Sequence, residues 1–361
     1  MTKIRIVAGL AAALAFGLTG AGNAQAPKKG GTLEFAISAE TPHYDCHGSD
    51  TYATLHFAAP FYSTLLQFDL PKYPGVKGDL AESWTVAKDQ LSYTFKLHKN
   101  VTFHDNKPLT SADVKATYDR LRNPAPGVVS TRKATFGDIA TIETPDPHTV
   151  VFKMKAVNPA MIEHFASPWN CIYQAERILA DPQWPKTNIL GTGPFKFTEH
   201  VKGSHVAGVR NNNYFRKGQP YLDGFKGIFF LQAAAMMNSL QGGQVMGEFR
   251  GITPAEADRL RQAMGNKVRI EEASWTLHLM VTFNTKRKPF DDVRVRRALT
   301  LAIDRWGGSQ GLARSSLLRH VGGVIRPGSP YAIDPKELEK FPGFSRDIAK
   351  SRAEAKKLLA E

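Results

Sequence analysis

Residues of the kinds that bind ligands are concentrated in one short polar loop of this chain. The sequence His43-Tyr44-Asp45-Cys46-His47 brings two imidazoles, a carboxylate and a thiol close together. His, Asp and Cys are all common metal ligands, but this spacing matches no standard metal site. Three interpretations stay open: a metal site, a polar loop that lines a binding cleft, and an ordinary surface loop. We assign no metal ligands to it.

The position of this loop after a predicted strand favours a role in binding. Residues 32–38 alternate, with Leu33, Phe35 and Ile37 on one face, which predicts a half-buried strand. Open α/β sheets bind their ligands beyond the carboxyl ends of such strands. The candidate ligand-binding residues in this loop are therefore Thr41, His43, Tyr44 and Asp45.

Two tryptophans are further candidates, because an indole ring can stack on a ligand. Trp169 lies between Pro168 and Asn170, which suggests a loop, and Trp275 lies in an alternating segment that predicts a strand. An aromatic side chain on a strand face more often belongs to the core. We add Trp169, Asn170 and Trp275 to the candidate ligand-binding residues.

Catalysis has little support in the sequence. There is no Gly-x-Ser-x-Gly elbow, no His-Glu-x-x-His motif and no P-loop. His104-Asp105 resembles an acid–base pair, but we expect it to shape a turn. Arg294, Arg296 and Arg297 could bind a carboxylate in bidentate fashion, or they could be solvated or salt-bridged. We predict no catalytic residues, no enzyme activity and no cofactor.

The two cysteines, Cys46 and Cys171, form a possible disulfide. An exported protein meets an oxidising compartment, where a cysteine pair is more plausibly bridged than free. The sequence leaves both states open, because it does not show whether the two Cα atoms come within bridging distance.

The N-terminus predicts export. Lys3 and Arg5 precede an apolar run, Ile6 to Leu18, and a region of small residues that ends at Ala26. This pattern is typical of a secretory signal peptide, here residues 1–26, and no Cys in it could carry a lipid anchor. Removing Lys3 and Arg5 lowers the formal net charge from +14 to +12.

Such a charge could favour anionic ligands or an anionic membrane surface, but a solvated basic surface is the simpler interpretation. Lys and Arg are dispersed through the chain rather than clustered with aromatic residues, so we expect no nucleic-acid partner.

Turn and cap signals divide the chain into alternating strands and helices. Tyr93–Leu97 and Val101–His104 predict two strands of a hairpin, and Thr110 with Asp113 predicts a capped helix. Further predicted elements are strands at 149–155, 225–231 and 275–283, and helices at 232–241, from Thr253, from Pro289–Asp292 and at 346–361.

The order of several motifs resembles one family of proteins. The motifs are Gly30 to Leu33, Leu80 to Trp84, Leu91 to Leu97, Val101 to Val114, Gly191 to Gly224, and Asn284 to Arg305. Any one of them is weak, but together and in this order they resemble the extracytoplasmic solute-binding proteins of family 5, the peptide/nickel-binding type that serves ABC importers.

The resemblance implies an α/β fold with two lobes, the type II-like periplasmic-binding-protein fold, and a β-rich subdomain inserted into the first lobe. On this chain the first lobe would comprise residues 27–60 and 189–265, and the insertion residues 61–188. Residues 266–361 would form a partial second lobe. The family places the helix that carries Arg294, Arg296 and Arg297 on the outside, which favours solvated side chains there.

The implied function is that of a periplasmic binding component that closes on a peptide or similar small polar solute and delivers it to a permease and ATPase complex. We expect a monomer. The alternative is a ligand-loaded sensor partner or a periplasmic chaperone on the same fold.

Two features depart from the family pattern. Met246 stands where the family usually has an Asp, which puts any polar contact of that Asp in doubt. The chain ends at Glu361, where family members continue through the second lobe, so we expect a fragment or a C-terminally truncated product.

Overall fold

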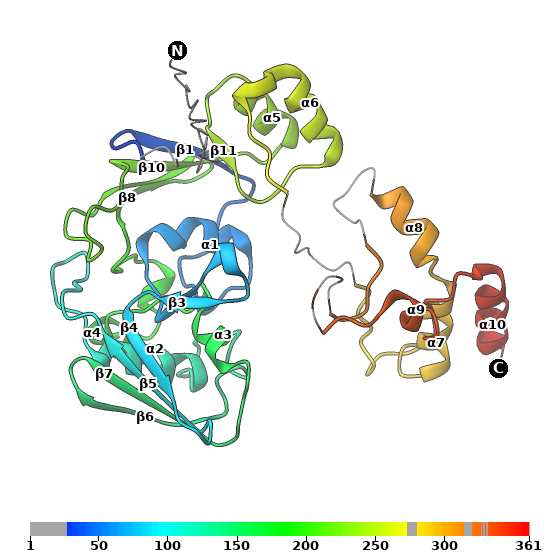
Figure 1. Ribbon diagram of the computed structural model, residues 1–361, viewed down its shortest axis with the longest axis horizontal. Coiled ribbons are helices and arrows are strands. Elements are labelled where there is room, and N and C mark those ends of the chain that lie inside the picture. The colour runs from blue at the N-terminus through cyan, green and yellow to red at the C-terminus, as the bar shows by residue number, and fades with distance from the viewer. Residues whose placement is uncertain are drawn as a thin grey trace, which may run out of the picture.

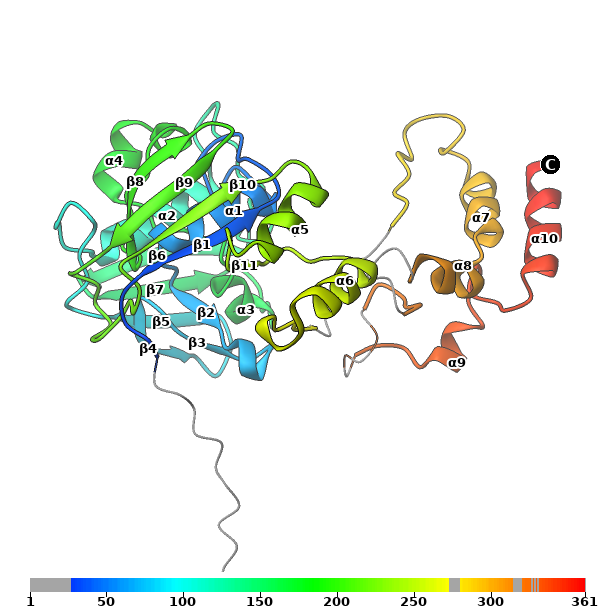
Figure 2. The same cartoon turned by 90° about the horizontal axis from the view of Figure 1, so that it is seen from above.

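The computed structural model describes residues 27–272, 280–313, 320–325, 327, 329 and 331–360. Within these residues the largest sheet has five strands in the order β11-β1-β10-β9-β8, seen side by side in Figure 2. β1 runs parallel to β10 and β11, whereas β9 is antiparallel to its neighbours β10 and β8. The strands are β1 (Thr32–Ile37), β8 (Phe195–Val201), β9 (His205–Arg210), β10 (Gly224–Phe229) and β11 (Gly247–Glu248).

Helices cover both faces of this sheet. Phe35 and Ile37 of β1 pack into an aromatic core with Phe57 of helix α1 (Tyr52–Ala58). Ala36, between them, faces the other way and packs with Met236 of α5 (Ala233–Gln241) and with α6 (Pro254–Met264). The predicted strand at 32–38 is confirmed, but its carboxyl half is buried on both faces rather than on one.

An antiparallel sheet in the order β4-β5-β7-β6 lies below the first one in Figure 1. Tyr118 of α2 (Ser111–Arg122) packs against Phe152 of this sheet and against Phe165, within one core that also contains Phe95. The other elements of this region are β2 (Leu66–Phe68), β3 (Val76–Gly78), β4 (Ala81–Val86), β5 (Ser92–Leu97), β6 (Ile139–Asp146), β7 (Thr149–Met154), α3 (Met161–Phe165) and α4 (Ala175–Ala180), with short 3-10 turns at Ala59–Phe61, Leu70–Lys72, Trp184–Lys186 and Gly265–Lys267.

The predicted hairpin between Tyr93–Leu97 and Val101–His104 is wrong. β5 is a central strand, hydrogen-bonded to β4 on one side and β7 on the other, so no edge is left for a third partner. Residues 101–104 instead form a turn region in which Thr102 makes an isolated bridge to Pro108.

The predicted helix starts are confirmed where a side chain caps the first turn. At α2 the backbone N–H of Thr110 donates to Asp113 at 2.8 Å, and at α6 that of Thr253 donates to Glu256 at 2.7 Å. α5 ends at Gln241, immediately before Gly242, as the two glycines predict.

A set of helices follows in the last part of the chain: α7 (Val293–Ala302), α8 (Arg305–Leu312), α9 (Pro335–Leu338) and α10 (Ile348–Ala360). Ala298 and Leu301 of α7 pack on Ala355 of α10. The helices expected after Asp292 and from Arg346 are confirmed, although α10 begins at Ile348. The expected strand at 275–283 lies largely outside the described residues, and 280–283 is not a strand.

None of the described helices has the length and apolarity needed to cross a lipid bilayer. The residue bounds of the two lobes and of the insertion stay a prediction.

The Gly191–Gly224 segment joins the two sheet regions through a close backbone contact at Gly193. Its N–H donates to the carbonyl of Phe61 at 2.9 Å, and its carbonyl accepts from Asn211 Nδ2 and lies 3.1 Å from His104 Nε2. Burial lowers the pKa of His104 to about 4, so it is neutral near pH 7 and serves this junction. A Cβ at Gly193 would lie only 2.4 Å from the Phe61 carbonyl carbon.

We therefore expect Gly193→Ala to lower the free energy of unfolding by about 2 kcal/mol or more, because the added methyl must displace backbone atoms. Gly247→Ala is the matched control, since its nearest neighbour would be a phenyl carbon at 3.7 Å. Urea titration followed by circular dichroism measures both variants. Equal stability of the two would contradict the close contact.

Candidate functional site

The carboxyl ends of the parallel strands β1 and β11 meet at one edge of the main sheet. Ser38 directly follows β1, and Arg250 follows β11 after one residue. Arg250 Nη1 donates to Ser38 Oγ at 3.2 Å, so the two strand ends are joined by their side chains. This is the edge at which α/β sheets of this kind place ligands.

A group of aromatic side chains lies within range of the Arg250 charge, which acts together with burial to lower the pKa of His56. The rings of Tyr52 and His56, one turn apart on α1, have centroids 5.8 Å apart, and the Trp169 ring lies 6.4 Å from that of Tyr52. Arg132 lies over the Trp169 ring, with Cζ 4.7 Å from its centroid. We call these side chains the edge cluster, which consists of Ser38, Tyr52, His56, Arg132, Trp169 and Arg250.

Local sequence explains how α1 presents its two rings. Thr51 caps the helix by accepting from the N–H of Ala53, and Leu55 and Phe57 turn into the core. Residues at i and i+4 lie on the same helical face, so Tyr52 and His56 stay together on the outer, half-buried side.

The charge state of His56 follows from its surroundings. Burial lowers its pKa, and the positive charge of Arg250 lowers it further. His56 is therefore neutral near pH 7, and its ring can donate one hydrogen bond and accept another.

A buried polar network lies behind the edge cluster. The Arg120 guanidinium donates to both carboxylate oxygens of Asp45, at 2.6 and 3.2 Å, and Tyr173 donates to the same carboxylate at 3.0 Å. Arg120 also lies 2.9 Å from His47 Nδ1, whose other nitrogen is 3.0 Å from the carbonyl of Cys171. Each of these side chains thus has its hydrogen-bond partners within the protein.

The contacts in this network shift the pKa values of Asp45 and His47. Burial alone raises the pKa of the Asp45 carboxyl, but the His47 and Arg120 side chains, with the hydrogen bonds from Arg120 and Tyr173, hold it below its usual value. Burial and the Arg120 charge lower the pKa of His47 to about 3. Asp45 is thus ionised and His47 neutral near pH 7.

A disulfide between Cys46 and Cys171 crosses the same region, with Cα atoms 6.1 Å apart. It links the loop after β1 to the segment that follows Trp169, across 125 positions of sequence. Together with the Asp45–Arg120 pair it holds Trp169 against α1.

The structure separates the predicted ligand-binding residues into two groups. Trp169 belongs to the edge cluster and is half-buried, whereas the other described candidates make contacts inside the protein. Asp45 and Asn170 are buried, and Asn170 donates to the carbonyl of His164 at 2.7 Å. Trp275 lies outside the described residues.

The remaining candidates hold the polar loop in place. The Thr41 hydroxyl bonds to that of Thr54 at 2.9 Å, and His43 accepts from the N–H of Asp45. Tyr44 stacks on Phe57 and lies 2.9 Å from His200 Nδ1. Contact of any of these residues with a ligand stays a prediction, and the geometry favours Trp169.

Five residues of the edge cluster are not among the candidates predicted from the sequence: Ser38, Tyr52, His56, Arg132 and Arg250. The i, i+4 pair Tyr52 and His56 was a usable signal, because residues at this spacing lie on the same face of a helix. Arg132 carried no such signal, since only the fold brings it to Trp169. Met246, which departs from the family pattern, has an exposed side chain. Its backbone N–H donates to the carbonyl of Glu34 on β1.

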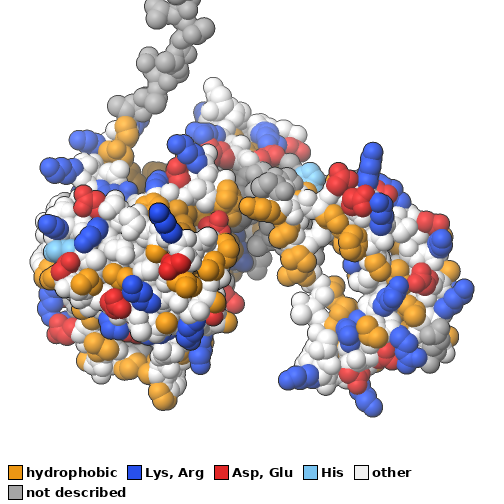
Figure 3. All heavy atoms as spheres, turned by 60° about the horizontal axis from the view of Figure 1, so that its bottom comes forward, with side chains coloured by type: hydrophobic (Ala, Val, Ile, Leu, Met, Phe, Trp, Pro, Cys, Tyr) orange, Lys and Arg blue, Asp and Glu red, His pale blue; other side chains and the backbone are white. Residues whose placement is uncertain are grey.

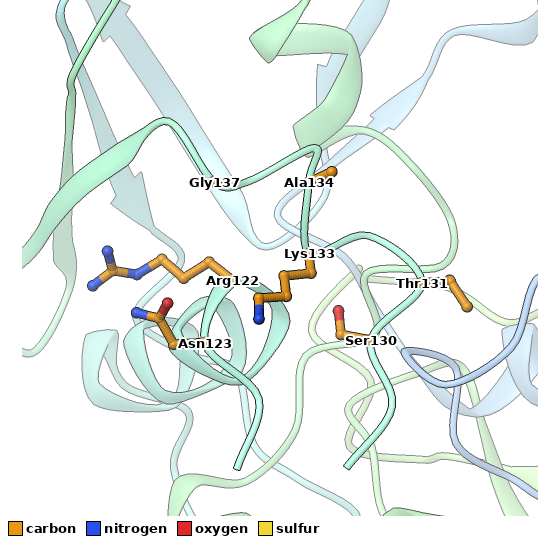
Figure 4. A pocket seen from close by; sticks show the side chains of 7 residues that line it. All are labelled: Arg122, Asn123, Ser130, Thr131, Lys133, Ala134 and Gly137. Carbon is orange, nitrogen blue, oxygen red and sulfur yellow. The ribbon is translucent and has the colours of Figure 1, made fainter. Parts of the chain in front are cut away.

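Two other kinds of site have less support in the structure. Among the described residues no group of three or more His, Cys, Asp or Glu side chains could hold a metal ion. A separate hollow of about 600 Å³ lies between the end of α2 and residues 130–137 (Figure 4). Its Arg122 is engaged with Asp119 and the carbonyl of Ile139, so the edge cluster is the stronger candidate.

Comparison with known proteins identifies related chains. The family model described as bacterial extracellular solute-binding proteins, family 5 Middle, matches residues 75–361. A putative ABC transporter peptide-binding protein of Brucella ovis is 31% identical over 299 residues, which covers 81% of this chain and 53% of the relative. Di/tripeptide-binding protein 2 of Pseudomonas aeruginosa is 31% identical over 328 residues, covering 84% of this chain and 58% of that protein.

A solved structure shares the fold. The binding protein AgaA of Agrobacterium tumefaciens R10, solved with agropinic acid, superposes with a TM-score of 0.74 at 25% identity, over 91% of this chain and 64% of that one. The expected α/β fold of periplasmic binding proteins is confirmed. The chain spans about half the length of the curated relatives that it matches.

Replacing Asp45 by Asn should lower the free energy of unfolding by about 3–5 kcal/mol, because Arg120 is left buried without its counter-ion. Asp258→Asn, which removes an exposed ion pair with Arg261, should change it by less than about 1 kcal/mol. Thermal and urea unfolding measure both.

The contribution of Asp45 to the free energy of unfolding changes with pH in a defined direction. Because the folded pKa of Asp45 is lowered, its stabilisation is present above the unfolded pKa of about 4 and is lost as pH falls through the folded value. Stability of Asp45→Asn should therefore depend less on pH below about 4 than that of the unmodified chain. Parallel pH profiles would contradict this assignment.

The double variant Cys46→Ser, Cys171→Ser should lose about 2–5 kcal/mol of stability, because the bridge closes a long loop in the unfolded chain. Dithiothreitol should lower the urea midpoint of the unmodified chain to that of the variant, and leave the variant unchanged. A midpoint of the unmodified chain that does not respond to the reductant would show that the bridge is not formed.

Proposed function

The chain belongs to family 5 of the bacterial extracellular solute-binding proteins, and from this premise we propose that it binds a peptide or similar small polar solute at the edge cluster. We further propose that it delivers this solute to the permease and ATPase complex of an ABC importer.

The observation that carries the proposal is the convergence of the edge cluster. Its side chains come from the end of β1, from α1, from residue 132, from the loop that carries Trp169 and from the turn after β11. Aromatic rings offer stacking surfaces, while the two guanidiniums, the imidazole and the hydroxyl offer hydrogen bonds. Sites for small ligands commonly combine an apolar surface with a few convergent polar groups.

The relatives support the same class of solute. The Brucella protein is described as peptide-binding and the Pseudomonas protein as di/tripeptide-binding. Both are longer than this chain, so the transport role of the whole protein is proposed rather than transferred. Family and relatives are solute-binding proteins, and we propose that this chain likewise has no enzyme activity.

The proposed mechanism is closure of two lobes. We propose that residues 27–60 and 189–265 form the first lobe, that 61–188 are inserted into it, and that 266–361 belong to the second lobe. Closure of a second lobe over the edge cluster would bury the solute and create the shape that a permease recognises.

Proteins of this family act outside the cytoplasm. We propose that residues 1–26 are a cleaved signal peptide and that the mature protein is a periplasmic monomer without a lipid anchor. On the face shown in Figure 3, Lys and Arg side chains are interspersed with acidic and apolar ones.

Isothermal titration with a panel of di- and tripeptides tests the proposal. We expect saturable binding with one site, and we expect Trp169→Ala to weaken it by about tenfold, since an aromatic contact of about 1–1.5 kcal/mol is lost. Tyr221→Ala is the control, because Tyr221 is an exposed aromatic residue at the opposite edge of the sheet, where its carbonyl accepts from Gly30.

Absence of saturable binding to every peptide in the panel would contradict the peptide assignment. Binding that Trp169→Ala and Tyr221→Ala weaken equally would place the site away from the edge cluster.

A further inference from the structure

We propose that Arg250 and Ser38 form an anion subsite, so that the preferred solute carries a carboxylate or a comparable anionic group there. This inference rests on the proposed function, because it specifies the chemistry of a solute bound at the edge cluster.

Arg250 is exposed, and its guanidinium makes a single side-chain hydrogen bond within the described residues, to Ser38 Oγ. A guanidinium has more N–H donors than this one bond uses, and they lie in one plane that matches the two oxygens of a carboxylate. The Ser38 hydroxyl accepts from Arg250 and can still donate its own proton to an anion.

The backbone around Arg250 is held independently of any ligand. The Glu248 carboxylate accepts from the backbone N–H groups of Arg250 and Gly251, both at 2.7 Å. Glu248 is thus engaged with the main chain, and among the described residues Arg250 makes no ion pair within 4.0 Å. The arginine is presented at the strand end without an internal counter-ion.

The neighbouring groups add to this preference. Burial lowers the pKa of His56, and the Arg250 charge lowers it further, so the imidazole is neutral near pH 7 and brings no negative charge to this region. Arg132 contributes a second positive charge over Trp169, although the exposed Asp50 carboxylate partly offsets it. The formal net charge of +12 that remains without Lys3 and Arg5 also favours approach of an anion.

A cationic group at the same position would meet the Arg250 charge, while the nearby Glu248 carboxylate is held by backbone N–H groups. The edge cluster should therefore rank solutes by charge as well as by shape. This property separates the proposal from general peptide binding, in which the aromatic contacts alone would carry affinity.

Four forms of one dipeptide test it, because they share shape and differ in charge. The forms are Ala-Phe, its C-terminal amide, N-acetyl-Ala-Phe, and N-acetyl-Ala-Phe amide, titrated calorimetrically at pH 7 into the unmodified chain. We expect the anionic N-acetyl acid to bind at least as tightly as the zwitterion, and about tenfold or more tightly than the neutral and cationic forms.

Arg250→Gln should remove this charge preference by weakening the two acids about tenfold, while the neutral form changes little. Ser38→Ala should weaken the acids by a smaller factor. Arg177→Gln is the matched control, since Arg177 is exposed on α4 and its side chain makes no hydrogen bond to another described residue. Because Arg250 is exposed, its variant should unfold at the temperature of the unmodified chain, which thermal scanning checks.

The possible outcomes are distinguishable. Binding of all four forms with equal affinity, or an equal effect of Arg250→Gln and Arg177→Gln, would overturn the anion subsite and leave the proposed function standing. Preference for the cationic amide would also overturn the subsite. Failure of all four forms and of the wider peptide panel to bind would overturn both proposals.

Discussion

The buried ion pair between Asp45 and Arg120 is the interaction on which the arrangement of this protein depends. It joins the loop after the first strand to helix α2, which lies in the region of the antiparallel sheet. Both side chains are buried, so the pair tolerates little displacement. Tyr173 and His47 complete its hydrogen bonding, and the Cys46–Cys171 bridge adds a covalent link beside it. Removing one member would leave a buried charge, and this cost keeps the two sheet regions in one relative position.

That constraint explains how a site can form from distant segments. Trp169 and Arg132 belong to the chain around the antiparallel sheet, whereas Ser38, Tyr52 and Arg250 belong to the main sheet and its helix. The contact between Tyr52 and Trp169 crosses this boundary, whereas Arg132 contacts Trp169 from within the antiparallel-sheet region. The charged groups of the polar loop thus make contacts inside the protein, and the proposed binding surface beyond them consists of rings, a hydroxyl and two exposed or half-buried arginines.

Sequence reasoning succeeded where the determining interactions are local. The capping pairs Thr110–Asp113 and Thr253–Glu256 predicted the starts of α2 and α6, and alternation predicted β1. It failed at Val101–His104, because β5 already pairs with the preceding strand β4 on one side and with the distant strand β7 on the other, which leaves no side free. The ligand-binding role of the polar loop, inferred from residue type and from its position after the first strand, stays a prediction, because neither signal distinguishes a buried, paired carboxylate from one that faces a cleft.

By itself the sequence determined the family, the α/β class and the ends of the strongest helices, because each of these depends on motifs or spacings within a short stretch. Only the tertiary structure decided that Asp45 pairs with Arg120, that Trp169 lies against α1, and that Arg250 meets Ser38. The physical reason is that these contacts join residues more than seventy positions apart, and their formation depends on sheet order and on side-chain burial. Neither property is encoded in the neighbourhood of any one residue.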